Sequence, residues 1–339
     1  MKVSICQYCK EEGAICNVLP LLKRSNLMID KTGKIKLFFA PVGFYPCNPI
    51  GAIYGVTTSD KARIKFSNEL FKRNNIDNIL MRFKRACITS LYEGNMRDNF
   101  IEYLSLALRI FDIHYFKEIK EAIDNNEFFN SPRWYDKSPL LLSQAIKCAC
   151  LLKTEKGYSS SMNNVPLGQT KYKFQYDCLC LTFKKIESIN SLRFAFFQGS
   201  LSIFKKYINF FHVSGFKFNQ QQVVVFDKVN KKYRILDIKD IRNDRTLCYI
   251  SSIPHASNQG MGNLTFGANE KCKIACQERR KFIFRLLAED DLSRNNDEVS
   301  KEILYKYKKQ FCPSEDSAKR ISTLVTQTLI ARRILSTVL

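Results

Sequence analysis

The 339-residue sequence has no long hydrophobic run. No stretch approaches the roughly 20 consecutive apolar residues that a membrane-spanning helix needs. The N-terminus also has no basic segment followed by an apolar one, the pattern of a secretory signal. The sequence has no P-loop and no G-x-G-x-x-G motif, the two glycine-rich loops that bind phosphate groups of nucleotides. Their absence argues against an ordinary nucleotide-binding α/β protein. We therefore expect a cytoplasmic protein that does not bind membranes.

Acidic residues are few in comparison with basic ones. The chain has 54 Lys and Arg against 32 Asp and Glu, a formal net charge of +22 that is spread along its length. A surface of this kind attracts polyanions, chiefly nucleic acid. The alternative is that an AT-rich genome enriches Lys, Asn, Ile and Phe. We expect DNA to be the partner, and no pattern indicates a protein partner.

Apolar residues make up 45% of the chain, enough for a sizeable core in one large α/β domain, with or without an appendage. The 13 cysteines are expected to be mostly buried thiols in a reducing compartment, with a few available to bind a metal.

Short apolar segments alternate with helical patterns along the chain. The expected strands cover 51–57, 140–146, 192–197 and 247–253, and the expected helices cover 61–84, 100–111 and much of the chain after about 272. The last helix has a start signal at 314–317 and one apolar face, formed by Ile321, Leu324, Val325, Thr328, Leu329, Arg332 and Leu335. This alternation predicts a mostly parallel, four-stranded central sheet, whose ligands bind at the carboxyl ends of the strands.

Three segments follow from this pattern. Residues 1–50 are rich in loops and contain a C-x-x-C pair, residues 51–271 form the α/β domain, and residues 272–339 form a helical C-terminal extension. Within the α/β domain, a β-hairpin insertion is expected near 223–238. A polar loop is expected over 157–170.

Five motifs stand at these strand and helix ends, in a recognisable order. They are Gly55-Val56-Thr57-Thr58-Ser59, then Gly94 with Met96, Arg97 and Asn99, then Ser143-Gln144-Ala145-Ile146-Lys147-Cys148, then Phe197-Gln198-Gly199, and finally Ile253-Pro254-His255-Ala256-Ser257-Asn258. In this order they resemble the motifs of the uracil-DNA glycosylase superfamily, in a divergent bacterial form. The resemblance implies a three-layer α/β/α fold and an enzyme that flips a base out of DNA and cuts its bond to the sugar.

The resemblance assigns the catalytic roles. His255 falls at the family's leaving-group histidine, which stabilises the departing base anion, although a loop or capping role is the alternative. Gln144 falls where the family has a base-reading Asn. Asp60 is the carboxylate nearest the first motif (Gly55, Thr57, Thr58 and Ser59), and it either stabilises the sugar cation and activates water or simply caps the following helix.

The remaining site residues would hold the flipped base and the DNA. Tyr54 and Phe66 are candidates for the aromatic ring that stacks on the base, although any one of the 26 Phe and 15 Tyr more often lies in the core. Met261 or Leu264 would be the apolar wedge inserted into the duplex. The other expected DNA contacts are Arg97, Asn99, Lys147, Ser257 and Asn258.

Cysteines offer one further resemblance, to the branch of the superfamily that holds a four-iron four-sulfur cluster. Cys6, Cys9, Cys148 and Cys178 follow the corresponding order, with Cys16, Cys150 and Cys180 as alternatives. A zinc site on Cys6, Cys9 and Cys16, or inert thiols, are the other interpretations. The base-release reaction itself requires no cofactor.

Two functions follow. The first is a DNA glycosylase that leaves an abasic site. Gln144 has a longer side chain than Asn, so the substrate is expected to be a modified base, such as one in phage DNA, rather than plain uracil. The second is a nucleic-acid-binding protein without catalysis on the same fold, because the first motif has no carboxylate or Asn in its middle and Ala256 replaces a proline.

Overall fold

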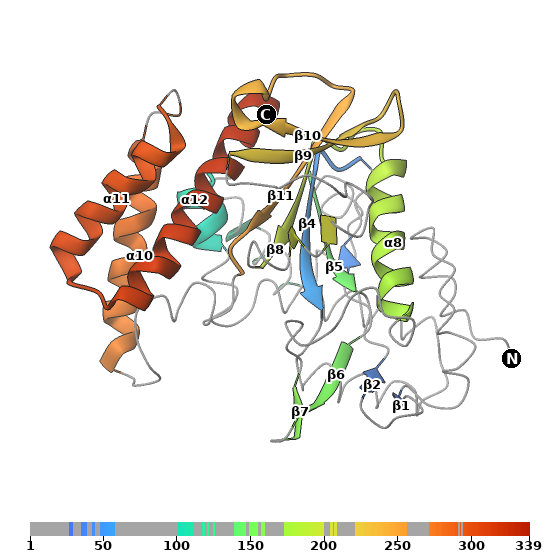
Figure 1. Cartoon of the computed structure of the whole chain (residues 1–339), viewed down its shortest axis with the longest axis horizontal. Coiled ribbons are helices and arrows are strands. Elements are labelled where there is room, and N and C mark those ends of the chain that lie inside the picture. The colour runs from blue at the N-terminus through green and yellow to red at the C-terminus, as the bar shows by residue number, and fades with distance from the viewer. Residues whose placement is uncertain are drawn as a thin grey trace, which may run out of the picture. The chain divides into compact units, whose positions relative to one another are not determined.

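The computed structural model describes residues 27–29, 35–38, 43–44, 48–57, 101–110, 117–118, 121, 125, 139–146, 149–154, 157–159, 173–199, 204–205, 207–208, 221–255, 271–290, 292 and 294–339 (Figure 1). The chain divides into two compact units, each assembled from separate segments. Unit 1 comprises 1–88, 136–192 and 205–214, and unit 2 comprises 89–135, 193–204 and 215–339. The expected helix over 61–84 lies outside the described residues.

Unit 1 contains a small antiparallel sheet in the order β1-β2-β6-β7. Its strands are β1 (Leu27–Ile29), β2 (Ile35–Phe38), β6 (Ala149–Thr154) and β7 (Gly157–Ser159). The sequence did not predict this sheet, and the polar loop expected over 157–170 begins instead with β7. Its central pair joins segments more than a hundred residues apart, such as Leu37 and Cys150.

Unit 1 also contains three paired strands that are separate from this small sheet. The strands β4 (Gly51–Thr57) and β5 (Leu140–Ile146) are parallel and have the predicted bounds, and β3 (Gly43–Phe44) is antiparallel to β5. The helix α8 (Lys173–Ser188) packs on β5 through buried Leu179, Phe183 and Ile186. The Thr182 hydroxyl of α8 donates to the Ala145 carbonyl at 2.8 Å, which fixes the helix on the strand.

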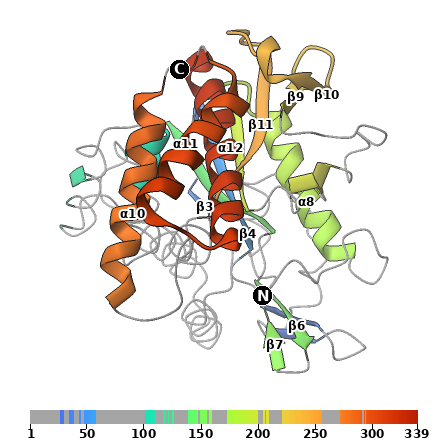
Figure 2. The ribbon, with the colours of Figure 1, turned by 60° about the vertical axis from the view of Figure 1, so that its left-hand side comes forward.

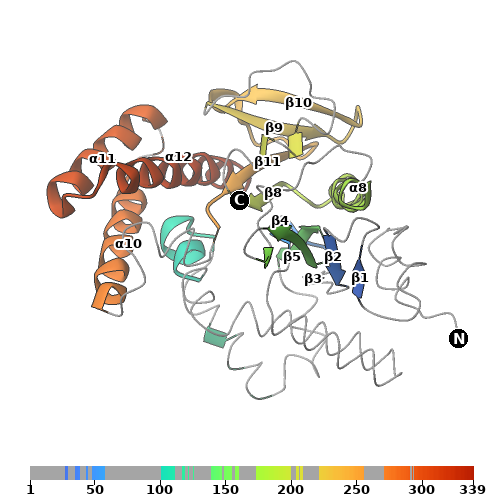
Figure 3. The same ribbon diagram turned by 60° about the horizontal axis from the view of Figure 1, so that its bottom comes forward.

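Unit 2 pairs four strands in the order β10-β9-β11-β8 (Figure 3). They are β8 (Phe194–Gln198), β9 (Gln222–Asp227), β10 (Lys232–Asp237) and β11 (Leu247–Ile253). Only β8 and β11 are parallel, and β9 and β10 form an antiparallel hairpin that adds to β11. Every residue of β8 and β11 is buried, which explains their unbroken runs of apolar and small residues. A short 3-10 turn, Ile238–Asp240, follows β10.

The C-terminal part of unit 2 contains the helices α10 (Lys271–Glu289), α11 (Asn296–Phe311) and α12 (Glu315–Val338) (Figure 2). The predicted start signal of the last helix is confirmed, because the Ser314 side chain accepts a hydrogen bond from the Ser317 backbone N–H. Every residue of the predicted apolar face is buried, and α12 packs on β11 and β8. The C-terminal helices therefore contribute to the core of unit 2.

A π-helical turn, Tyr103–Ala107, lies within the segment where an ordinary helix was expected. The Tyr103 hydroxyl and the Thr328 hydroxyl are 3.1 Å apart, and the Tyr103 ring lies 5.7 Å from that of Phe284. Glu102, just before the turn, accepts two hydrogen bonds from the buried Arg280 guanidinium, at 2.9 and 2.6 Å. Contacts with α10 and α12 thus hold this segment in unit 2.

The structure confirms an α/β fold with C-terminal helices and corrects the predicted sheet. A four-stranded, mostly parallel sheet is wrong: the parallel pair in each unit carries antiparallel strands at its side, β3 in unit 1 and β9 with β10 in unit 2. The reason is that the predicted hairpin pairs directly with a core strand, and β3 is too short to give a sequence pattern. Among the described helices, none is long and apolar enough to cross a membrane.

Candidate functional site

In unit 2, the candidate site is the carboxyl end of the parallel pair β8 and β11. Ile253, the last residue of β11, lies opposite Gln198, the last residue of β8. The Gly199 N–H donates to the Ile253 carbonyl at 2.8 Å, so the two strand ends are tied together. The φ of Gly199 is 148°, an angle that side-chain-bearing residues disfavour, and this explains the glycine at the position.

His255 lies two residues beyond the end of β11 and is half-buried. Burial lowers the pKa of its imidazole below the ordinary value of 6.5. The ring is therefore neutral at neutral pH, with one N–H as a donor and the other nitrogen as an acceptor. A neutral imidazole in this position can donate a hydrogen bond to an oxygen that becomes negatively charged.

Gln327 of α12 supports the same strand ends, and the sequence analysis missed it. Its side-chain amide donates to the Gly199 carbonyl at 3.0 Å and to the Ser252 hydroxyl at 2.8 Å. Both Gln327 and Ser252 are buried. The available signal was the run of three uncharged polar residues, Thr326 to Thr328, in a helix whose other buried residues, apart from Arg332, are apolar.

In unit 1, the structure brings two predicted site residues together. Gly55 of the first motif lies opposite Gln144 on the neighbouring parallel strand, and Thr57 lies opposite Ile146 at the strand ends. The carboxyl end of the β4 and β5 pair therefore combines the first motif with the predicted base-reading position.

Tyr54 does not fit the stacking role proposed for it. Its side chain is completely buried, at 0% exposure, on β4 opposite Ser143. A ring that stacks on a flipped base must be open to the ligand, so this burial places Tyr54 in the core. The alternation of strand residues did not reveal this, because both faces of β4 are covered along Gly51 to Gly55.

The other predicted site residues lie outside the described part of the chain. The predicted catalytic residue Asp60, the stacking candidate Phe66, and Thr58 and Ser59 of the first motif are among them. The predicted DNA contacts among them are Arg97, Asn99, Lys147, Ser257, Asn258, Met261 and Leu264. The predicted metal ligands among them are Cys6, Cys9, Cys16 and Cys148. Their roles stay predictions.

Cysteines give no metal centre within the described residues. No group of three or more His, Cys, Asp or Glu side chains there could hold an ion. Cys178 lies on α8, as does Cys180, while Cys150 lies on β6. Since the C-x-x-C pair and Cys148 are outside the described residues, the iron–sulfur cluster stays a prediction.

No protein-family model, curated protein or solved structure matches the chain. The resemblance to uracil-DNA glycosylases therefore depends on the order of the five motifs and on what the strand ends can do chemically.

Proposed function

We propose that the protein is a DNA glycosylase of the uracil-DNA glycosylase superfamily, built on a three-layer α/β/α core. It flips a modified base, such as one in phage DNA, and hydrolyses the bond between that base and its sugar, leaving an abasic site. The observation that carries this proposal is the position of the half-buried His255, two residues after the buried strand β11 and beside the strand end that Gly199 closes.

The reaction needs charge stabilisation at two places. The bond between the sugar C1′ and the base nitrogen breaks, its electron pair leaves with the base, and positive charge builds on the sugar. His255 donates a hydrogen bond to the base oxygen that takes up the negative charge, as a donor already in place before the bond breaks. Water then adds to C1′ and loses a proton, and no cofactor takes part.

Base recognition belongs to Gln144 in this proposal. A side-chain amide has a donor and an acceptor side by side, so it can pair with two groups on the edge of a base. The side chain of Gln144 has one more methylene group than the base-reading Asn of uracil-DNA glycosylases. This extra length shifts the hydrogen bonds to the base and favours a base other than uracil. Asp60 is the proposed anion near the sugar and water.

The test is base release from DNA by the purified protein. Uracil-containing DNA and genomic DNA from phages with modified bases are incubated with the protein, and released bases are identified by mass spectrometry while alkali reveals abasic sites. We expect release from a modified DNA and its loss in His255→Ala. His114→Ala is the matched control, because His114 lies outside every motif, and it should retain release.

The alternative is a cytoplasmic DNA-binding protein on the same fold that does no chemistry. Its supporting observation is the first motif, where no carboxylate or Asn stands between Gly55 and Ser59 to activate water. This alternative predicts DNA binding without release of any base and equal binding by the wild type and His255→Ala. If the protein is instead a glycosylase that acts in repair or in defence against phage, the wild type should release a base and His255→Ala should not.

A further inference from the structure

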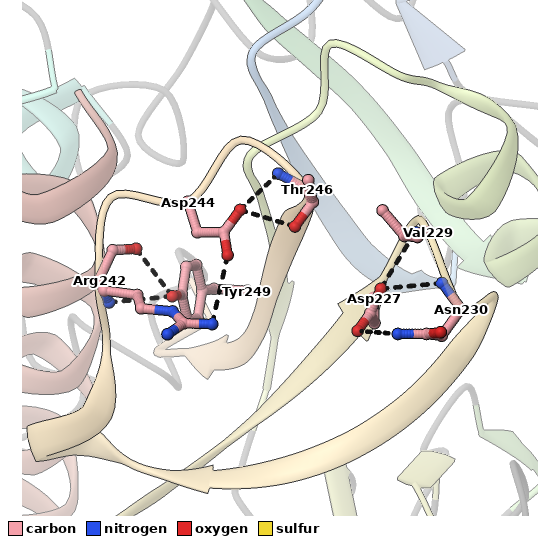
Figure 4. Close-up of polar contacts among 7 residues, drawn as sticks. All are labelled: Asp227, Val229, Asn230, Arg242, Asp244, Thr246 and Tyr249. Carbon is pink, nitrogen blue, oxygen red and sulfur yellow. Dashed lines mark hydrogen bonds and ion pairs between the residues drawn. The ribbon is translucent and has the colours of Figure 1, made fainter.

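Two loops of unit 2 meet at the amino-terminal end of β11. The first is the turn 227–231 between β9 and β10, and the second is the loop 241–246 that leads into β11 (Figure 4). The Lys228 N–H donates to the Thr246 carbonyl at 2.9 Å, and the Lys228 ammonium donates to the Arg245 carbonyl at 3.1 Å. We name this pair of loops the basic end.

The first loop has a fixed conformation. The Asp227 carboxylate accepts hydrogen bonds from the backbone N–H groups of Val229 and Asn230, both at 3.0 Å, and from the Asn230 side chain at 2.9 Å (Figure 4). These bonds, Asn230 first, lower the pKa of Asp227. Lys231 follows with a φ of 52°, which completes the reversal into β10.

The second loop is held in the same manner. Asp244 accepts from the Thr246 N–H and hydroxyl at 2.9 and 2.6 Å, and it forms an ion pair with Arg242 at 3.4 Å. The Tyr249 hydroxyl accepts from the Arg242 N–H at 3.0 Å and donates to its carbonyl at 2.8 Å. In both loops, an aspartate is used to fix the backbone (Figure 4).

Positive charge predominates at the basic end. The loops 227–231 and 241–246 contain four Lys and Arg against two Asp, a net charge of +2, and both aspartates make the loop contacts just described. Three of these basic residues are exposed, Lys231, Arg242 and Arg245, and the exposed Lys232 follows at the start of β10.

Like charges gather around Lys228 in particular. Burial is the main cause that lowers its pKa; the positive charges of Arg193 and Lys231 lower it further, while Cys248 and Asp244 act in the opposite direction. Arg193 donates to the Asn243 side chain at 2.7 Å, while its Nε has no acceptor within the described part of the chain. A ligand rich in anionic oxygens would relieve this repulsion.

We propose that the basic end binds the phosphate backbone of duplex DNA. Charge complementarity carries the proposal, because rigid loops present several guanidinium and ammonium groups, the groups that contact phosphates in protein–DNA interfaces. Val229, 71% exposed at the tip of the first loop, would face the sugars between them. The choice of DNA, rather than another polyanion, rests on the proposed function.

This contact is separate from the candidate catalytic end. Arg193 precedes β8 and Thr246 precedes β11, whereas Gly199 and His255 follow the same strands. The seven residues of β11 span about 20 Å. A duplex that touches both ends of the strand therefore covers at least about 6 base pairs, at roughly 3.4 Å each.

The test compares two triple variants of equal charge. The first is Lys231→Asn, Lys232→Gln and Arg245→Gln, where Asn suits the positive φ of Lys231. The control is Lys301→Gln, Lys308→Gln and Lys309→Gln, three exposed positions on α11. For each protein, the affinity for duplex DNA is measured over a series of salt concentrations, and base release is measured in parallel.

We expect the first variant to lower the slope of log affinity against log salt by about 0.9 for each lost phosphate contact, or about 2.7 in total. This corresponds to a roughly 100-fold weaker affinity near physiological salt. The control should keep the wild-type slope. The proposal would be overturned if both variants lost the same affinity for duplex DNA, or if the first variant bound duplex DNA as the wild type does. It would also be overturned if the first variant lost binding to anionic lipid vesicles while its DNA binding was unchanged.

Base release separates this inference from the proposed function. If the wild type releases no base from any DNA but binding depends on the basic end, the glycosylase proposal fails and the DNA contact stands. If release occurs and requires His255 while the first variant binds as the wild type does, only the contact fails.

Discussion

Replacing Gln327 by Met should destabilise the protein by about 2–4 kcal/mol, because one buried and one partly buried polar group lose their donor. Met has a similar length and volume, so the change adds little cavity cost. The Gly199 carbonyl and the Ser252 hydroxyl, which accept from Gln327 at 3.0 and 2.8 Å, would both lose this bond. A buried group left without a partner costs about 1–3 kcal/mol.

A double-variant cycle measures this contribution. In Gln327→Met the Ser252 hydroxyl has lost its donor, and Ser252→Ala removes that hydroxyl. The double variant should therefore be about 1 kcal/mol more stable than the value obtained by adding the stability losses of the two single variants. The free energy of unfolding is read from urea denaturation. Ser336→Ala, an exposed position on α12, is the control and should cost less than about 0.5 kcal/mol. A Gln327→Met loss as small as the control, or strict additivity with Ser252→Ala, would refute the reasoning.

Three further predictions concern charge and backbone. Burial lowers the pKa of His255 below 6.5, so the unfolded chain binds a proton at this histidine at a higher pH than the folded chain does. The free energy of unfolding should therefore decrease as the pH falls below about 6.5. His255→Asn should make the free energy of unfolding, measured in urea, depend less on pH in this range. Cys312 ends α11 with a φ of 44°, so Cys312→Gly should raise stability by about 0.5–1 kcal/mol, and a lower urea midpoint would contradict this. Glu102→Gln removes the charge that Arg280, 4% exposed, pairs with at 2.6 Å, and it should cost about 3 kcal/mol in urea denaturation; a cost near zero would show that the pair adds no stability.

The elements that the sequence predicted well have strong local signals. The bounds of β4, β5 and β11 follow from apolar runs that begin or end at Gly51, Pro139 and Pro254. Ser314 marks the start of α12 because its hydroxyl caps the first turn. Such features depend on neighbours in the chain and so can be read from a single sequence.

The elements that were missed depend on partners distant in the sequence. The small sheet of unit 1 joins β2 to β6, and neither strand alternates clearly enough to reveal the pairing. The sequence analysis did not predict helix α8, whose Leu179, Phe183 and Ile186 are buried. The π-helical turn is held by contacts from α10 and α12, which no local pattern contains.

The candidate site divides in the same way. The position of His255 after a core strand could be predicted, since it follows from the end of β11. The role of Gln327 could not, because its two acceptors lie 128 and 75 residues away in the chain. The choice between the core and the stacking role for Tyr54 stayed open, because covering both faces of a strand is a property of the tertiary structure.

The measurement that tests the glycosylase proposal most directly is the identification, by mass spectrometry, of a free base released from modified phage DNA by the wild type and by His255→Ala. The account predicts one abasic site for each base released by the wild type and no release by the variant. Release of the same base at the same rate by His255→Ala, or no release by the wild type from any DNA that it binds, would contradict it.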